Sequence, residues 1–148
     1  MIMKISTKGR YGLRALVDLA ANAQDSPLAL AEIAGRQKIS LNYLEQVFGT
    51  LRKAGIVRSV KGPSGGYMLG RDAAQITVEE VLRALEGEFS IAPQEPGQEP
   101  DLVQRAIQRL VWDRIDEKVN EILTSKSLAA LVTEYQGLKQ ASDNMYYL

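Results

Sequence analysis

The chain has 148 residues, of which 45% are apolar, and it contains no cysteine and no histidine. The missing thiols and imidazoles exclude disulfides, thiolate metal sites, iron–sulfur clusters held by cysteine, cysteine nucleophiles and histidine acid–base catalysis. No stretch approaches the roughly 20 apolar residues of a membrane span, and the N-terminal residues lack the apolar centre of a signal peptide. We therefore expect a cytoplasmic protein with one compact core and an appendage.

The net charge is zero, but the two halves of the chain carry opposite charges. Residues 1–71 contain 11 Lys or Arg against 4 Asp or Glu, whereas residues 72–148 contain 7 against 14. A basic half suits the phosphates of a nucleic acid, and an acidic half suits a different partner. The alternative is a chance segregation of solvated surface charges.

A first helix is predicted over residues 7–21, where apolar residues recur at helical spacing. Its first turn carries Lys8 and Arg10, although the helix dipole favours acids there by about 0.3 to 1 kcal/mol. A DNA phosphate at this end would accept from the free backbone amides and attract Lys8, Arg10 and the Tyr11 hydroxyl. The alternative is that both cations point into water.

A second, short helix is predicted over residues 30–37, followed by a turn and a third helix that begins after the N-cap Ser40. Gly55 is suited to a left-handed cap at the end of this third helix. Its buried stripe is expected to comprise Leu41, Leu44, Val47, Phe48 and Leu51.

The opposite face of the third helix suits the edges of DNA bases. Asn42 and Gln46 can bind adenine through two hydrogen bonds, and Glu45 can accept from cytosine N4. Tyr43 lies on the same face and is also a candidate for base contact. For Glu45 the alternative is an ion pair with a nearby cation, Arg52 or Lys53.

A basic hairpin is predicted directly after this helix. Strands over residues 57–61 and 66–70 can pair because the loop GPSGG supplies the backbone freedom that a tight turn requires. Leu28 can add a short strand beside the hairpin. The helix-turn-helix and hairpin together predict a winged helix. The expected contacts to phosphates or to the minor groove are Lys8, Arg10, Tyr11, Arg52, Lys53, Arg58, Lys61 and Ser64.

A fourth helix is predicted over residues 78–86, with Thr77 and Glu80 as a capping box, and the proline-rich residues 89–100 read as a loop or linker. A long helix is then expected from Asp101. Its apolar stripe is too long for the small domain to cover, so we expect a second copy of the chain to cover it; packing only within the chain is the alternative. The expected dimerisation residues are Ile107, Leu110, Val111, Ile115, Val119 and Ile122.

A last helix is expected from Leu128 to about Gln136, folded back on the end of the long one. The tail that follows ends in Tyr146, Tyr147 and Leu148. We expect these three residues to dock into a pocket of another protein, where backbone amides capture the terminal carboxylate. The alternative is that the tail covers the chain's own long helix.

These elements predict a mainly α fold with a small β wing. The expected parts are a winged helix-turn-helix domain at residues 1–88, a linker at 89–100, a dimerisation helix and short following helix at 101–137, and a tail at 138–148. No enzyme is expected, because the acidic pairs Glu79-Glu80 and Asp116-Glu117 point to different sides of their helices. The loop GPSGGYMLG also lacks the Gly-Lys-Ser/Thr of a phosphate-binding loop.

Three segments resemble the Rrf2 family of bacterial winged-helix repressors: STKGRYGLRALVDLA, LAEIAGRQKISLNYLEQVFGTLRKAGIVRSV and KGPSGGYMLGR, in this order and spacing. The resemblance is strong over residues 3–88. The family contains an iron–sulfur cluster branch, IscR, whose cluster cysteines lie in the loop before the long helix. Residues 87–100 hold no cysteine, so neither a cluster nor any other cofactor or metal is expected here.

The cysteine-metabolism branch of the family, CymR, is the nearer resemblance, since that branch carries no cluster and ends in a similar aromatic and aliphatic tail. The resemblance implies control of cysteine or sulfur metabolism, with the cysteine-synthesis enzyme O-acetylserine thiol-lyase (cysteine synthase) as a partner. We predict a homodimeric repressor that presents two reading helices to a pseudo-palindromic operator in double-stranded DNA. The alternative is an adaptor that uses its winged helix and tail to bind only protein.

Overall fold

The computed structural model describes residues 4–93, 97, 99 and 101–146. It is mainly helical with a two-stranded antiparallel hairpin, which confirms the predicted fold class. The helices of the N-terminal body are α1 (Thr7–Asn22), α2 (Leu30–Gln37), α3 (Leu41–Lys53), the 3-10 turn η1 (Ala73–Gln75) and α4 (Val78–Glu86), and the strands are β1 (Val57–Val60) and β2 (Gly66–Leu69).

The body is organised around a core that α1, α2, α3 and α4 share. Leu44, Val47, Phe48 and Leu51 of α3 are fully buried there, as their spacing predicts. The prediction for Leu41 is wrong, because this side chain is 42% exposed. Leu41 is the first residue of α3, and the buried part of the helix begins only at Leu44.

The hairpin pairs from Val57 with Leu69 to Val60 with Gly66, and each strand is one residue shorter at its C-terminal end than predicted. Leu28 adds the expected bridge: its amide donates to the Tyr67 carbonyl over 3.0 Å and its carbonyl accepts from the Tyr67 amide over 2.8 Å. The close approach requires glycine at position 66, where a Cβ would lie 2.4 Å from the Leu28 carbonyl oxygen. The hairpin therefore has a defined position on the body.

Local capping signals confirm both ends of α3 and the start of α4. The Ser40 hydroxyl accepts from the Tyr43 amide over 3.1 Å. Gly55 has a φ of 78°, and its amide and that of the next residue donate to carbonyls of the last turn, which is a Schellman cap. The capping box of Thr77 and Glu80 is present.

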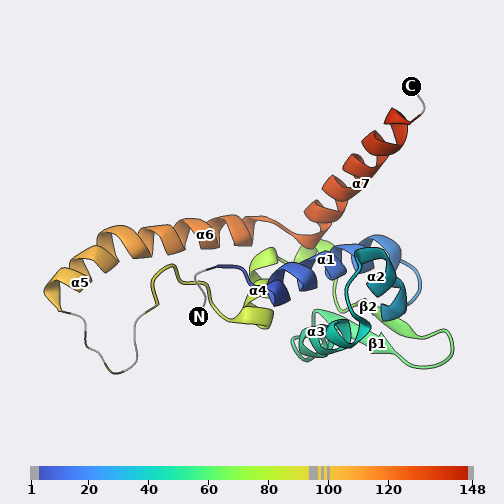
Figure 1. Ribbon diagram of the computed structural model, residues 1–148, viewed down its shortest axis with the longest axis horizontal. Coiled ribbons are helices and arrows are strands. Elements are labelled where there is room, and N and C mark those ends of the chain that lie inside the picture. The colour runs from blue at the N-terminus through green and yellow to red at the C-terminus, as the bar shows by residue number, and fades with distance from the viewer. Residues whose placement is uncertain (1–3, 94–96, 98, 100, 147–148) are drawn as a thin grey trace.

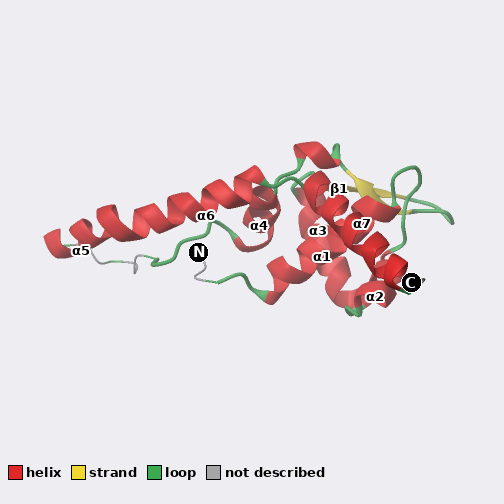
Figure 2. Cartoon of the chain, turned by 90° about the horizontal axis from the view of Figure 1, so that it is seen from above, coloured by secondary structure: helices red, strands yellow, loops and turns green. Residues whose placement is uncertain are grey.

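Beyond the body, α5 (Leu102–Ile107), the π-helical turn η2 (Gln108–Trp112) and α6 (Asp113–Ser125) form one continuous helical rod. Figures 1 and 2 show the rod leaving the body on one side, with α6 near α4 and α5 far from it. The predicted long helix is thus present, although its periodicity gave no sign of the π turn. Most of its apolar stripe is exposed, with Leu110 at 71% and Ile122 at 62%.

The last helix, α7 (Leu128–Met145), corrects two predictions. It continues about nine residues past Gln136, so most of the expected tail is helical. It also packs on α1 and not on the rod, because the Leu128 amide donates to the Ile76 carbonyl over 2.8 Å and directs the chain across the body. Its outer half projects away from the body (Figure 1). None of the helices in the described residues is both long and apolar enough to cross a bilayer.

The tail residues are only partly described. Tyr146 follows α7 directly and is 84% exposed, so it does not cover the rod as the alternative supposed. Tyr147 and Leu148 lie outside the described residues.

Candidate nucleic-acid interface

The free face of α3 presents three polar side chains from its first two turns. Asn42, Glu45 and Gln46 are all exposed, while the core residues of the same helix hold it against the body. The ion pair considered for Glu45 is absent: no salt bridge among the described residues joins it to Arg52 or Lys53. Amide and carboxylate groups on one exposed helix face can read base edges in a major groove.

Tyr43 differs from its neighbours because it is half-buried and packs against the core. Its ring meets that of Tyr11 edge to face, with centroids 6.2 Å apart and planes at 84°. The contact brings the N-terminal half of α1 beside the first turn of α3. The structure thus joins two candidate DNA-contacting elements that are about 30 residues apart in the sequence.

The start of α1 is not the free anion site that its sequence suggests. Glu86, the last residue of α4, places its Oε1 atom within 2.7 Å of the Ser6 amide and 3.0 Å of the Gly9 amide, and the Ser6 hydroxyl also donates to it. Two of the amides that a phosphate was expected to use, those of Ser6 and Gly9, therefore donate to Glu86. A carboxylate from 80 residues later in the chain occupies the positive end of the helix.

The cationic side chains of the first turn of α1, the end of α3 and the hairpin are available to an outside anion. Arg10, Arg52, Lys53, Arg58 and Lys61 are exposed and Lys8 is half-buried. None of the six forms an ion pair with a carboxylate of the described residues. Ser64 is exposed in the loop between β1 and β2. An exposed cation without an internal partner is suited to a phosphate of DNA.

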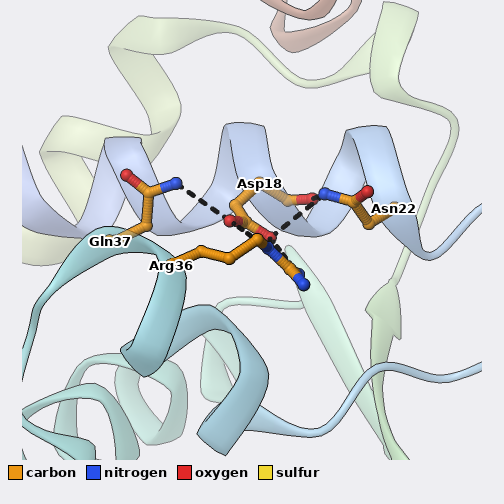
Figure 3. A network of polar contacts seen from close by, with 4 residues as sticks. All are labelled: Asp18, Asn22, Arg36 and Gln37. Carbon is orange, nitrogen blue, oxygen red and sulfur yellow. Dashed lines mark hydrogen bonds and ion pairs between the residues drawn. The ribbon is translucent and has the colours of Figure 1, made fainter.

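A buried charge network behind the turn between α2 and α3 was not predicted (Figure 3). Asp18 of α1 is only 4% exposed. Its carboxylate accepts from Arg36 at 2.7 to 3.3 Å, from the Gln37 amide at 2.9 Å and from Asn22 at 3.3 Å. An acid on an apolar helix face, eighteen residues before an Arg-Gln pair, is too weak a signal to find this network from sequence.

Charge pairing keeps Asp18 ionised inside the body. Burial raises the pKa of Asp18, but hydrogen bonds from Arg36 and Gln37, the Arg36 charge and the Asn22 contact outweigh it, so the pKa lies below its ordinary value. The same contact raises the pKa of Arg36. Because Gln37 ends α2, the network ties the turn, and hence the start of α3, to α1.

Two further cations near this turn were missing from the predicted contacts. Lys38 is exposed and adopts the left-handed conformation, with a φ of 56°, in the turn itself. Arg14 is exposed on α1, and its guanidinium donates to the Gln37 side-chain oxygen at 3.2 and 3.3 Å. The position of Lys38 in the turn of a helix-turn-helix could have indicated it, whereas Arg14 depends on the packing of α1 against α2.

Comparison with known proteins places these features in a family. The family model described as "Rrf2: Iron-dependent Transcriptional regulator" matches residues 5–134. The HTH-type transcriptional regulator IscR of Xenorhabdus nematophila is 40% identical over 139 residues, which are 94% of this chain and 85% of that protein. IscR of Photorhabdus laumondii is 39% identical over the same shares of both chains.

Solved structures agree with the sequence relatives. The chain resembles CymR of B. subtilis, titled the global cysteine regulator of that organism, with a TM-score of 0.76 and 39% identity, covering 90% of this chain and 98% of CymR. It also resembles T. potens IscR, with a TM-score of 0.73 and 38% identity, covering 89% of this chain and 88% of that one. These relatives are regulators and not enzymes.

The donor atoms of this chain do not fit the iron of the family description. Iron–sulfur clusters are held by cysteine thiolates, with histidine in some centres, and this chain has neither residue. Within residues 4–93, 97, 99 and 101–146, no three acidic side chains gather closely enough to hold a metal ion. The winged helix, the exposed face of α3 and the matches over nearly the whole length lead to one conclusion: this chain belongs to the Rrf2 family of winged-helix transcriptional regulators, related to both CymR and IscR.

Proposed function

We propose that this regulator is a repressor that binds a pseudo-palindromic operator as a homodimer, without an iron–sulfur cluster. The observation that carries the proposal is the set of exposed cations on α3 and the hairpin, Arg52, Lys53, Arg58 and Lys61, which form no ion pair among the described residues. In a winged helix-turn-helix dimer, the second helix of each motif enters the major groove of one half-site. The experiment that tests the proposal is footprinting on the DNA upstream of the protein's own operon.

Base contacts are assigned to Asn42, Glu45 and Gln46, while Tyr43 acts mainly through its packing with Tyr11. Phosphate and minor-groove contacts are assigned to Lys8, Arg10, Tyr11, Arg52, Lys53, Arg58, Lys61 and Ser64. The first group is uncharged or acidic and faces outward from α3, so it supplies discrimination and not general affinity. The second group carries the charge that neutralises DNA.

Replacing Gln46 with alanine is expected to relax the choice of base at one position of each half-site. A bidentate contact from glutamine to adenine contributes about 1 to 3 kcal/mol of discrimination, which is about 5-fold to 150-fold in relative affinity. The measurement is binding to the operator and to its single-base variants. Gln136→Ala on the projecting half of α7 is the matched control, and it should leave every affinity unchanged.

Gln46→Ala should leave the fold intact because Gln46 is exposed, so its melting temperature should equal that of the wild type within about 2 °C. A uniform loss of affinity over all sequences would contradict the assignment. Gln46 would then support the helix without reading a base.

The dimer is assigned to the rod. Ile107, Leu110, Val111, Ile115 and Ile122 are exposed and Val119 is half-buried, so a helical stripe of branched apolar side chains faces solvent in the single chain. Contiguous exposed apolar surface of this kind marks an interaction site, and an isologous contact between two copies covers it twice.

Control of cysteine or sulfur metabolism, with cysteine synthase as partner, is a further part of the proposal. It rests on the similarity to CymR, the global cysteine regulator of B. subtilis, and on the exposed aromatic residue Tyr146 at the end of α7. An exposed aromatic side chain at the end of a helix can insert into a pocket of another protein. Tyr147 and Leu148 are assigned to the same contact.

Deleting residues 146–148 is expected to abolish binding of cysteine synthase while leaving the melting temperature unchanged. Tyr146 is exposed and makes no core contact, so its removal costs the fold little. Calorimetric titration of cysteine synthase into both forms of the regulator measures the effect. The proposal for the tail fails if the wild type does not bind the enzyme, or if the truncated chain binds equally well.

A further inference from the structure

Glu86 joins the end of α4 to the first turn of α1 across the body. Its Oε1 atom accepts from the backbone amides of Ser6 and Gly9, at 2.7 and 3.0 Å, and from the Ser6 hydroxyl. We propose that Glu86 is a positioning residue for DNA binding. It holds the first turn of α1 in the position from which the side chains of that turn reach the DNA phosphates. This inference rests on the proposed function.

A glycine lies on each side of the contact between Glu86 and α1. A Cβ on residue 9 would lie 2.7 Å from the carboxyl carbon and from Oε1 of Glu86, so only glycine leaves room for the carboxylate. On the other side, Glu86 is the last residue of α4 and is followed by Gly87, whose φ of 86° ends the helix. Glycine at position 9 therefore allows the carboxylate to approach the helix end.

The first turn that Glu86 holds is the one that carries candidate phosphate contacts. Lys8 and Arg10 belong to it, and Tyr11 follows and packs edge to face on Tyr43 of α3. Glu86 accepts from two of the amides at the positive end of α1, those of Ser6 and Gly9. The side chains of this turn are the groups that we assign to contact with DNA.

The chain beyond Glu86 leads to the rod. Five residues later, the Ile91 amide donates to Asp116 Oδ1 of α6 over 2.9 Å. Glu86 therefore lies between α6, which belongs to the proposed dimer interface, and the first turn of α1. Glu86 thus lies at the junction of the part of the molecule assigned to the dimer and the part assigned to DNA binding.

Two substitutions test the inference by different routes. Gly9→Ala displaces the flexible end of the Glu86 side chain and leaves the charge in the protein, whereas Glu86→Ala removes the carboxylate and, with it, the hydrogen bonds to the Ser6 and Gly9 amides. Both are expected to weaken operator binding about tenfold at 100 mM salt. Both should also reduce the magnitude of the negative slope of log K against log salt by about 2 per subunit, because Lys8 and Arg10 no longer reach their phosphates.

The matched control is Gly137→Ala on α7, where a Cβ meets nothing within 4 Å. It makes the same glycine-to-alanine change in a helix and should leave both affinity and slope at the wild-type values. Melting temperatures are recorded for all variants. Ser6→Ala removes only the hydroxyl donor to Glu86 and serves as a milder variant if Glu86→Ala does not fold.

The salt slope separates positioning from simple stabilisation. If the variants melt earlier but keep the wild-type slope, Glu86 is only a helix cap and the inference is overturned. If the wild type binds no duplex at 50 mM salt, the proposed function fails and the inference fails with it. A wild type that binds, with reduced slopes in both Gly9→Ala and the charge-removing variant, supports the inference.

Discussion

Raising the monovalent salt from 50 to 200 mM is expected to weaken operator binding by about 10³-fold to 10⁵-fold, which is the loss for 6 to 10 neutralised phosphates. Each subunit offers six candidate cations: Lys8, Arg10, Arg52, Lys53, Arg58 and Lys61. None of them forms an ion pair within the described residues, so binding exchanges DNA counterions for protein cations without breaking an internal salt bridge. The loss of affinity with salt therefore increases with the number of cations that contact phosphates.

The measurement is fluorescence anisotropy of a labelled operator at several salt concentrations. Arg58→Gln and Lys61→Gln in the hairpin should each reduce the slope by about 1 per subunit. Lys118→Gln on the rod is the control, since Lys118 pairs with Glu121 at 3.3 Å and lies outside the candidate interface. A flat response to salt in the wild type would contradict the proposal and would favour an adaptor that binds only protein.

Replacing Leu110 with glutamate is expected to convert the dimer to a monomer and to weaken operator binding by about 10²-fold to 10⁴-fold. Leu110 is exposed in the single chain, so a carboxylate there does not disturb the fold. In a symmetric interface each substitution appears twice, which buries two unpaired charges. A monomer binds only one half-site and loses the advantage of linking two binding modules.

Light scattering after size-exclusion chromatography measures the mass, and the same anisotropy assay measures the affinity. Thr124→Glu introduces the same charge at an exposed polar position of α6 and should leave the dimer intact. The assignment of the rod as the interface fails if the Leu110 variant remains dimeric. If it becomes monomeric and still binds the operator at full strength, dimerisation is not part of DNA recognition.

Local features of this fold could be predicted from the sequence, because neighbouring residues form them. Ser40 and Thr77 cap helices through amides three residues away, and Gly55 ends α3 within its own turn. The loop GPSGG between two segments that can pair is sufficient for the hairpin. The same holds for the exposed face of α3, since the buried stripe of a helix defines the opposite face as well.

Tertiary packing decided the features that join distant parts of the chain. The contact of Glu86 with Ser6 spans 80 residues, and that of Asp18 with Arg36 spans 18. No periodicity encodes such pairs, because a carboxylate finds its partner only once the helices have packed. The sequence by itself therefore determined the elements and the face that α3 presents, whereas tertiary structure decided which anion lies at the start of α1 and where α7 extends.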